Sequence, residues 1–219
     1  MRFKAVIFDL DGTLLNTLED IVDSVNQVLI GYGLDTNQIE YYKLRIGRGA
    51  QNLIRQASCG NLDDSKIDDA VREFQRIYAK RFNLKTEKYD GIEDLLTWLD
   101  KKGIFYAVLS NKPHNLTNKI IRHYFPHRNF SAIIGQQTGI PLKPDPTQVI
   151  KIISHIKCKA EEVVFIGDSG IDMETAHNAG TFALGILWGY REQSELVKYG
   201  ANALAHTPKD IELFLETNI

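Results

Sequence analysis

The sequence predicts a doubly wound α/β core built on a parallel sheet, with an α-helical cap domain inserted into it. Short apolar runs rich in β-branched and aromatic residues recur along the chain, and amphipathic stretches separate several of them. One long segment near the start has helical periodicity and interrupts this alternation. Because the apolar runs are continuous rather than alternating with polar residues, they suit parallel strands that are covered by helices on both faces.

The core is expected to consist of alternating strands and crossover helices. Five strands are predicted, at Phe3–Phe8, Ile104–Leu109, Ser131–Ile134, Val163–Ile166 and Phe182–Leu187. Four helices are predicted between and after them, at Ile92–Lys102, Asn115–Tyr124, Thr147–Ile156 and Asp172–Ala179. Strands that alternate with amphipathic helices favour a doubly wound parallel sheet.

The inserted segment is expected to form a helical cap. Its helical spacing is visible at Ile21, Val25, Val28, Leu29 and in the stretch Ile67–Arg81. The predicted domains are a core of residues 1–15 and 90–219 and a cap of residues 16–89. The insert leaves the core after the first strand and returns before Gly91, so its two junctions should lie close together and form a hinge.

The composition is that of an ordinary globular protein with small-molecule partners. Hydrophobic residues make up 43% of the chain, charged residues 25%, and the formal net charge is -2. Lys and Arg are scattered, so we expect neither a nucleic-acid nor a membrane-surface partner. The apolar run Met1–Leu10 is too short for a signal or a membrane span and contains Asp9, so we expect a cytoplasmic protein.

Several common sites are missing from the sequence. Cys59 and Cys158 lie far apart and belong to no CxxC pair, so neither a disulfide framework nor a zinc site is indicated. The chain has no GxxxxGK[ST], GxGxxG or HExxH motif. Phosphate-loop nucleotide hydrolysis, hydride transfer and zinc proteolysis therefore lose support.

Polar residues follow the expected strands at the edge where open α/β sheets bind ligands. The segments concerned are Asp9–Leu14, Ser110–Lys112, Lys143–Pro146 and Gly167–Ser169, with Asp172 shortly afterwards. If these ends meet, three or four carboxylates converge with a lysine and a hydroxyl. A hard divalent cation would neutralise such a cluster, and an oxygen-only ligand set that shares substrate phosphates suits Mg²⁺. A phosphorylated small molecule is then the expected partner.

Asp9 and Asp11 stand two residues apart at the end of the first strand, where an extended chain directs both side chains to one face. One carboxylate can attack while its neighbour supplies or removes a proton. A simpler interpretation is an Asp-Gly turn in which Asp11 caps a helix. That interpretation suits Asp11 and Gly12 alone, whereas the whole set of polar strand ends favours catalysis.

With these segments the chain resembles the haloacid dehalogenase-like phosphatases over nearly its full length. The four signature segments of that family appear in order as Asp9–Leu14, Ser110, Lys143 and Gly167–Asp172. The resemblance implies a Rossmann-like core and Mg²⁺ as cofactor. The stretch Gly180–Tyr190 is most similar to phosphoglycolate phosphatase-like members, which carry an early helical cap.

The resemblance also implies a role for each matching residue. Asp9 would be the nucleophile that forms an aspartyl-phosphate, and Asp11 would protonate the leaving alcohol and then activate water. Mg²⁺ would be bound by Asp9, by the backbone carbonyl of Asp11 and by Asp168, while Asp172 would hold a metal-bound water or orient the lysine. The phosphoryl oxygens would be bound by Ser110, Asn111 and Lys143.

A cationic loop in the cap suggests a substrate contact. Arg45-Ile46-Gly47-Arg48-Gly49 lies between expected cap helices, and its glycines would let the loop approach the site. The hypothesis is that Arg45 or Arg48 recognises a second anionic group, such as the carboxylate of 2-phosphoglycolate. An exposed cationic loop without this role is the alternative.

Other functions within and outside the family remain open at this point. Asp11 together with Asp168 argues against a dehalogenase, and a phosphonatase would need a cap lysine, for which Lys43 is a weak candidate. A β-phosphoglucomutase-like enzyme shares both aspartates and the metal, although Thr13 favours hydrolysis. Pyrophosphatase, nucleotidase and a catalytically silent phosphate-binding protein are further alternatives. A monomer and a homodimer are both compatible with the sequence.

Overall fold

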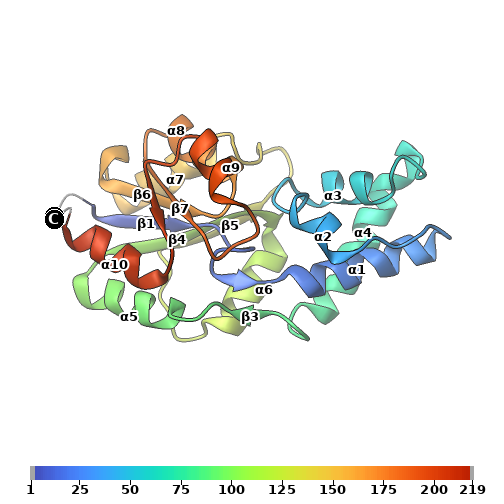
Figure 1. Cartoon of the computed structure of the whole chain (residues 1–219), viewed down its shortest axis with the longest axis horizontal. Coiled ribbons are helices and arrows are strands. Elements are labelled where there is room, and N and C mark those ends of the chain that lie inside the picture. The colour runs from blue at the N-terminus through green and yellow to red at the C-terminus, as the bar shows by residue number, and fades with distance from the viewer. Residues whose placement is uncertain (1–2, 218–219) are drawn as a thin grey trace.

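The computed structural model of the chain describes residues 3–217 and has two parts, an α/β core and a group of helices beside one end of its sheet (Figure 1). The core sheet has six strands, in the order β5-β4-β1-β6-β7-β8. Every neighbouring pair in this sheet is parallel. This arrangement confirms the predicted α/β fold class.

The first strand lies in the interior of the sheet and determines where the polar strand ends meet. The strands of the sheet are β1 (Ala5–Phe8), β4 (Phe105–Pro113), β5 (Ala132–Gln136), β6 (Val163–Gly167), β7 (Phe182–Ile186) and β8 (Ala203–Ala205). Phe8 pairs in register with Val108 of β4 on one side and with Ile166 of β6 on the other. The strand order reverses direction at β1, which makes its carboxyl end the expected position for a ligand site.

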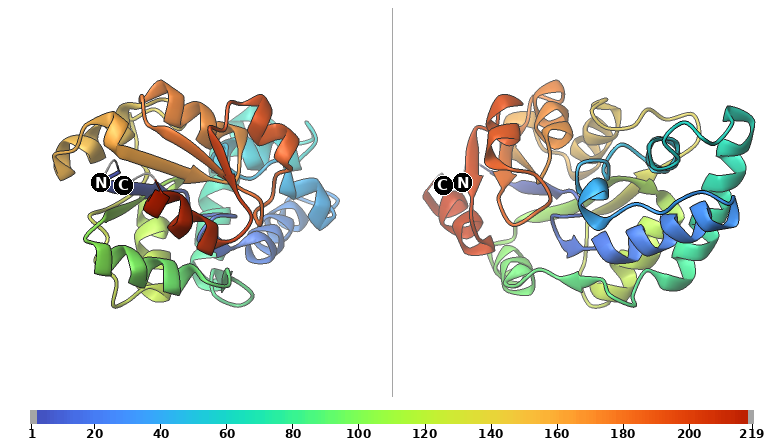
Figure 2. Two further views of the ribbon diagram at one scale, coloured as in Figure 1. Left: turned by 60° about the vertical axis from the view of Figure 1, so that its left-hand side comes forward. Right: turned by 45° about the vertical axis from the view of Figure 1, so that its right-hand side comes forward.

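Helices cover both faces of the sheet, as Figures 1 and 2 show. The helices on one face are α5 (Ile92–Lys102), α6 (His114–Tyr124) and α10 (Pro208–Thr217). Those on the other face are α7 (Thr147–Ile156), α8 (Gly170–Asn178) and α9 (Gln193–Lys198), and a short 3-10 helix, Ala160–Glu162, precedes β6. Successive strand residues serve opposite faces: Val6 and Phe8 pack with the first group, Ala5 and Ile7 with the second.

The helices beside the sheet form a second layer, whose buried side chains join the apolar cluster on one face of the core. They are α1 (Leu18–Gly31), α2 (Ile39–Lys43), α3 (Ala50–Ala57) and α4 (Asp64–Arg81). The two long helices α1 and α4 pack along each other, with buried Val25 and Val28 of α1 and Phe74 and Tyr78 of α4 in the same apolar cluster. Within residues 3–217, no helix combines the length and the apolarity needed to cross a membrane.

The chain passes between the two parts along an antiparallel pair of two-residue strands, β2 (Leu15–Asn16) and β3 (Glu87–Lys88). Leu15 pairs with Lys88 and Asn16 with Glu87. Asp20 of α1 is 0% exposed and strengthens this junction. Its carboxylate accepts hydrogen bonds from the backbone N–H of Lys85 at 3.0 Å and from the N–H and hydroxyl of Thr86 at 2.9 and 2.8 Å.

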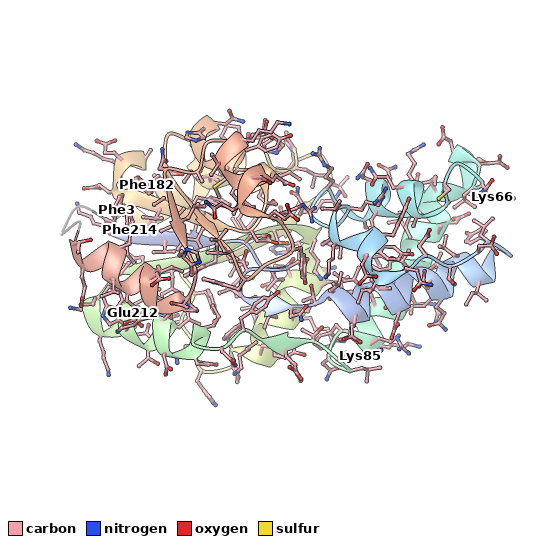
Figure 3. All side chains as sticks on the ribbon, viewed as in Figure 1. Phe3, Lys66, Lys85, Phe182, Glu212 and Phe214 are labelled. Carbon is pink, nitrogen blue, oxygen red and sulfur yellow. The ribbon has the colours of Figure 1, made fainter. Side chains whose placement is uncertain are left out.

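An aromatic cluster closes the core at the end remote from the helical layer, where Phe3, Phe182 and Phe214 lie together in Figure 3. The ring centroid of Phe3 is 5.4 Å from that of Phe182 and 5.6 Å from that of Phe214. Lys66 and Lys85, labelled in the same view, lie on the helical side. The aromatic cluster and the carboxyl ends of the strands are thus at opposite ends of the sheet.

Candidate active site at the carboxyl edge of the sheet

The sheet brings four of the expected site residues together with a residue of α8. Asp9 follows β1, Ser110 lies in β4 and Asp168 follows β6, so the two strands that neighbour β1 place their residues on either side of Asp9. The Nζ atom of Lys143 lies 2.7 Å from Asp9 Oδ1 and 2.7 Å from Asp172 Oδ1. All five side chains are buried.

Three of these carboxylates are arranged as a metal site would require. One oxygen from each of Asp9, Asp168 and Asp172 lies within 4.8 Å of the others. Lys143 and Ser169 occupy both oxygens of Asp172, whereas within residues 3–217 no donor hydrogen-bonds to Asp9 Oδ2 or Asp168 Oδ1. An anionic, oxygen-only set of this kind fits a hard divalent cation, with Asp9 and Asp168 free to coordinate it directly.

Burial makes this concentration of negative charge costly. It is the main reason that the pKa of Asp9 is raised to about 7, even though the ammonium of Lys143 acts in the opposite direction. It also raises the pKa of Asp168 well above the ordinary value, with further increases from Asp172 and Asp9. For Lys143, burial lowers the pKa, but the two carboxylates outweigh it and the net direction is upward. A bound cation would therefore relieve repulsion that the lysine alone does not remove.

Local chain geometry fixes the two acids of the β6–α8 turn. Ser169 begins α8 as its N-cap, and its hydroxyl and backbone N–H both donate to Asp172 Oδ2, at 2.6 and 3.1 Å. Asp172 therefore both stabilises the start of α8 and contacts Lys143 in the site. Only glycine fits beside these acids: a Cβ atom on Gly167 would lie 2.3 Å from Asp172 Cγ, and one on Gly189 would lie 2.2 Å from Asp168 Cβ.

The carboxylate of Asp11 is held separately from the metal-compatible group. Its Oδ1 accepts a hydrogen bond from the hydroxyl of Thr17 at 2.6 Å and lies 2.9 Å from the Nζ of Lys112. The ammonium of Lys112 also donates to the hydroxyl of Tyr78, on α4, at 2.8 Å. Asp11 therefore has its own cation, and that cation contacts the helical layer.

Lys112, Thr17 and Tyr78 were not predicted as site residues. Lys112 was visible only as the last residue of a polar strand end, and nothing in the sequence pairs it with Asp11. Thr17 follows the first strand by several residues, and Tyr78 lies within the apolar spacing of a helix. Their contacts depend on how the helices pack against the core, which periodicity does not reveal.

Ser110 and Asn111 differ in how many of their side-chain hydrogen-bonding atoms already have partners in the protein. Ser110 lines the cavity described below, and its Oγ accepts only a 3.2 Å hydrogen bond from the N–H of Lys112 among the described residues. The Asn111 side chain accepts from the N–H of Lys143 at 2.8 Å and donates to the carbonyls of Gly47 and Lys143, at 2.9 and 3.1 Å. This favours a positioning role for Asn111 over the predicted phosphate contact.

A small cavity of about 40 Å³ lies against Asp9 and Asp11, between the core and the helical layer. Its lining residues are Asp9, Asp11, Ile21, Ile46, Gly47, Gly49, Ala50, Leu53, Phe74, Tyr78, Ser110, Asn111, Lys112, Pro113 and Leu116. Most of the wall is apolar, and its polar groups gather where Asp9, Asp11 and Lys112 lie.

The two cap arginines lie outside this cavity. The guanidinium of Arg45 stacks 3.5 Å from the ring centroid of Tyr41 and donates to the Tyr41 carbonyl at 2.7 Å. Arg48 is exposed and lines a separate surface pocket with Arg191. Their loop reaches the cavity through Ile46, Gly47 and Gly49 instead, so substrate recognition by either arginine stays a prediction.

Comparisons with known proteins agree with this geometry. A family model described as haloacid dehalogenase-like hydrolase matches residues 6–186. A phosphoglycolate phosphatase of Pseudomonas putida is 33% identical over 192 residues, covering 85% of this chain and 70% of the relative, and phosphoglycolate phosphatase 1 of Pseudomonas aeruginosa is 30% identical, covering 95% and 78%. The crystal structure of a predicted phosphoglycolate phosphatase from Haemophilus somnus superposes with a TM-score of 0.91 at 26% identity, covering 98% and 99% of the two chains. The family match over residues 6–186 and the relatives at 30% identity or more show that the chain belongs to the haloacid dehalogenase-like hydrolases.

Proposed function

We propose that the protein is a Mg²⁺-dependent phosphatase that hydrolyses a small phosphate monoester similar to 2-phosphoglycolate through an aspartyl-phosphate. The observation that carries the proposal is the separation of Asp9 and Asp11 into two environments. Asp9 lies beside Lys143 and Asp168, whereas Asp11 lies beside Lys112 and Thr17. One carboxylate can therefore attack phosphorus while its neighbour handles protons. The named relatives support the choice of ester.

The reaction would proceed in two displacements at phosphorus. In the first, an oxygen of Asp9 forms a bond to phosphorus as the bond to the leaving oxygen breaks, and Asp11 gives its proton to that oxygen. In the second, water attacks phosphorus, Asp11 takes up the water's proton, and the bond to Asp9 breaks to release phosphate. The chain ends the cycle with Asp9 ionised and Asp11 protonated.

Neutralising the phosphoryl oxygens is the main electrostatic task in such a reaction. The ammonium of Lys143 and the hydroxyl of Ser110 are suited to bind those oxygens, and Asn111 fixes the backbone of Lys143. Mg²⁺ held by Asp9 and Asp168 would supply the remaining positive charge. Asp172 holds Lys143 in place from the side opposite Asp9 and would carry no direct bond to the metal.

The helical layer would act as a cap of residues 16–89 on a core of residues 1–15 and 90–219. The β2–β3 pair lies where the chain crosses twice, so it is the natural hinge. The cavity lies between the core and the helical layer, so movement of the cap would change access to it. Opening would admit the ester and closure would exclude bulk water during transfer. A closed cap over a small space favours metabolites over macromolecules.

Phosphate release from 2-phosphoglycolate tests the proposal. We expect turnover that requires Mg²⁺, disappears with a chelator and is lost in Asp9→Asn, which keeps the side-chain shape but removes the nucleophile. Pyrophosphate, nucleoside monophosphates and hexose phosphates, assayed alongside, separate the related hydrolases. Isomerisation of β-glucose 1-phosphate would instead indicate a mutase. Absence of turnover on every ester by the metal-loaded protein would refute the phosphatase and indicate a silent phosphate-binding protein.

A further inference from the structure

The active-site cavity has a cation other than Lys143, the lysine proposed to bind the phosphoryl group. Among the described residues that line the cavity, Lys112 alone carries a positive charge. Lys143, which faces Asp9 and Asp172, is absent from this wall. The chain therefore presents two separate buried ammonium groups, one at the nucleophile and one at Asp11 inside the cavity.

The donors of this second group are not all used. An ammonium has three N–H groups, and Lys112 directs two of them to Asp11 Oδ1 and the Tyr78 hydroxyl, at 2.9 and 2.8 Å. The Tyr78 hydroxyl accepts that bond, and within residues 3–217 its own hydrogen has no acceptor. The Lys112 side chain is 5% exposed and Tyr78 is 1% exposed. Two buried donors thus remain available at the cavity wall.

The apolar surroundings make it unfavourable to leave these donors unpaired, and they strengthen the hydrogen bonds that the donors form with a ligand. Ile21, Leu53, Phe74 and Leu116 form the apolar wall around them. Buried donors without partners destabilise the closed form, and charged hydrogen bonds are strong where water is excluded. Burial raises the pKa of the Tyr78 phenol well above its ordinary value, so it stays protonated and can donate. The missing partner is an anionic oxygen acceptor.

From these donors we infer that Lys112 Nζ and the Tyr78 hydroxyl bind a carboxylate of the substrate, which makes these two residues determinants of specificity. The inference rests on the proposed function and deepens it. A carboxylate presents two anionic oxygens, so it can accept a hydrogen bond from each of these two donors. The carboxylate must lie close to the scissile ester, because the cavity also touches Asp9 and Asp11.

The two donors come from different parts of the molecule. Lys112 lies near the carboxyl end of β4 in the core, and Tyr78 lies on α4 of the helical layer. A carboxylate bound by both would bridge core and cap, so a substrate that carries one would stabilise the closed form. An ester without this group would close the cap over two unsatisfied donors. Specificity would then arise on closure, through contacts made by Lys112 and Tyr78 instead of Arg45 and Arg48.

The test compares 2-phosphoglycolate with ethyl phosphate, which has the same two carbons but no carboxylate. Lys112→Met should lower the ratio of the two kcat/KM values by about tenfold to a hundredfold, the range for a lost charged hydrogen bond. Tyr78→Phe should lower it by roughly threefold to tenfold. Loss of the Lys112–Asp11 contact slows both esters in Lys112→Met, and the ratio cancels that common effect.

Lys119 provides a matched control. This exposed lysine also joins the core to α4, donating to the Ala79 carbonyl at 2.6 Å, but it lies outside the cavity wall. Lys119→Met should leave the ratio unchanged. An unchanged ratio in Lys112→Met, or a collapsed ratio in Arg45→Ala or Arg48→Ala, would overturn the inference.

A binding experiment separates failure of this inference from failure of the proposed function. In Asp9→Asn, which cannot turn over, calorimetry with Mg²⁺ should show tighter binding of 2-phosphoglycolate than of ethyl phosphate, and adding Lys112→Met should remove the difference. Hydrolysis of both esters without preference would support the proposed phosphatase activity and contradict the carboxylate subsite. Absence of hydrolysis together with a Lys112-dependent binding preference would support the carboxylate subsite and contradict the proposed phosphatase activity.

Discussion

Lys143 Nζ lies 2.7 Å from Asp9 Oδ1, so the proposed nucleophile is joined to a buried cation from a loop 134 residues further along the chain. Removing that cation in Lys143→Met should lower kcat at least about a hundredfold, the usual effect of losing one stabiliser of transition-state charge. It should also destabilise the fold by about 3–5 kcal/mol, because Asp9 and Asp172 lose their partner. Steady-state kinetics and denaturant unfolding measure the two effects.

Lys143→Arg is the control, because it keeps the positive charge but replaces the ammonium group by a guanidinium group of different shape. It should recover most of the stability but little of the rate, since a guanidinium fork cannot place one donor on both Asp9 and Asp172 as the ammonium does. Full activity in Lys143→Met would contradict the assigned role.

Binding of Mg²⁺ should depend on pH because the metal competes with a proton. Burial raises the pKa of Asp9 to about 7, so below that pH the carboxyl group is increasingly protonated and the cation must displace the proton. The apparent affinity for Mg²⁺ should therefore weaken as pH falls below 7, by about tenfold per pH unit for one displaced proton. Calorimetric titration of the protein with Mg²⁺ at several pH values from about 5.5 to about 8.5, on both sides of the pKa of Asp9, measures how the affinity changes with pH.

In Asp9→Asn this slope should become shallower, because the amide has no proton to release, whereas Asp168, whose pKa burial also raises, can still exchange a proton for the metal. Affinity that stays constant with pH in the unmodified protein would show that Asp9 is ionised throughout and that the proposed competition is absent.

Thr17 connects the first cap helix to the proposed acid and base. Its hydroxyl donates to Asp11 Oδ1 at 2.6 Å, and its backbone N–H donates to the Tyr190 hydroxyl at 2.9 Å. Thr17→Val removes only the hydroxyl and should lower kcat by roughly twofold to tenfold, the range for one hydrogen bond. KM should change little. A solvent isotope effect that differs from that of the unmodified enzyme would show that proton transfer by Asp11 is the step affected.

Asp20 should matter for stability more than for chemistry. Asp20→Ala leaves the backbone N–H groups of Lys85 and Thr86 and the Thr86 hydroxyl without their acceptor in a buried position. We expect a loss of about 2–5 kcal/mol in the free energy of unfolding. Asp23, on the same helix, is the control: its side chain is 35% exposed, and Asp23→Ala should cost less than about 1 kcal/mol. Equal losses in both variants would contradict the stabilising role assigned to Asp20 at the junction of the two parts.

The sequence was sufficient for the fold and for the residues that strand ends place together. Ile92–Lys102 and Thr147–Ile156 begin and end as predicted, because their apolar spacing is regular and their ends carry clear signals. Asp9, Ser110 and Asp168 meet because parallel neighbours share one carboxyl edge. Several short elements were not predicted: β8 has three residues, α9 has six, α2 has five and α3 has eight.

Contacts between the helical layer and the core could not be predicted either. Gly47 and Gly49 line the cavity, but the arginines beside them point to other partners, since Arg45 stacks on Tyr41 and Arg48 is exposed. Which side of a glycine-rich loop faces a site depends on backbone conformation, and residue types alone do not specify it. The pairing of Lys112 with Tyr78 depends likewise on the approach of α4 to β4.

The paired strands β2 and β3 carry the polypeptide into and out of the helical layer at one narrow neck, where Leu15 faces Lys88 and Asn16 faces Glu87. Insertions or deletions anywhere between these pairs leave the spacing of the sheet untouched. The helical layer can therefore vary between relatives while the core stays the same. A protein engineer could join the corresponding segment of a relative at these same four positions and so change the substrate selectivity.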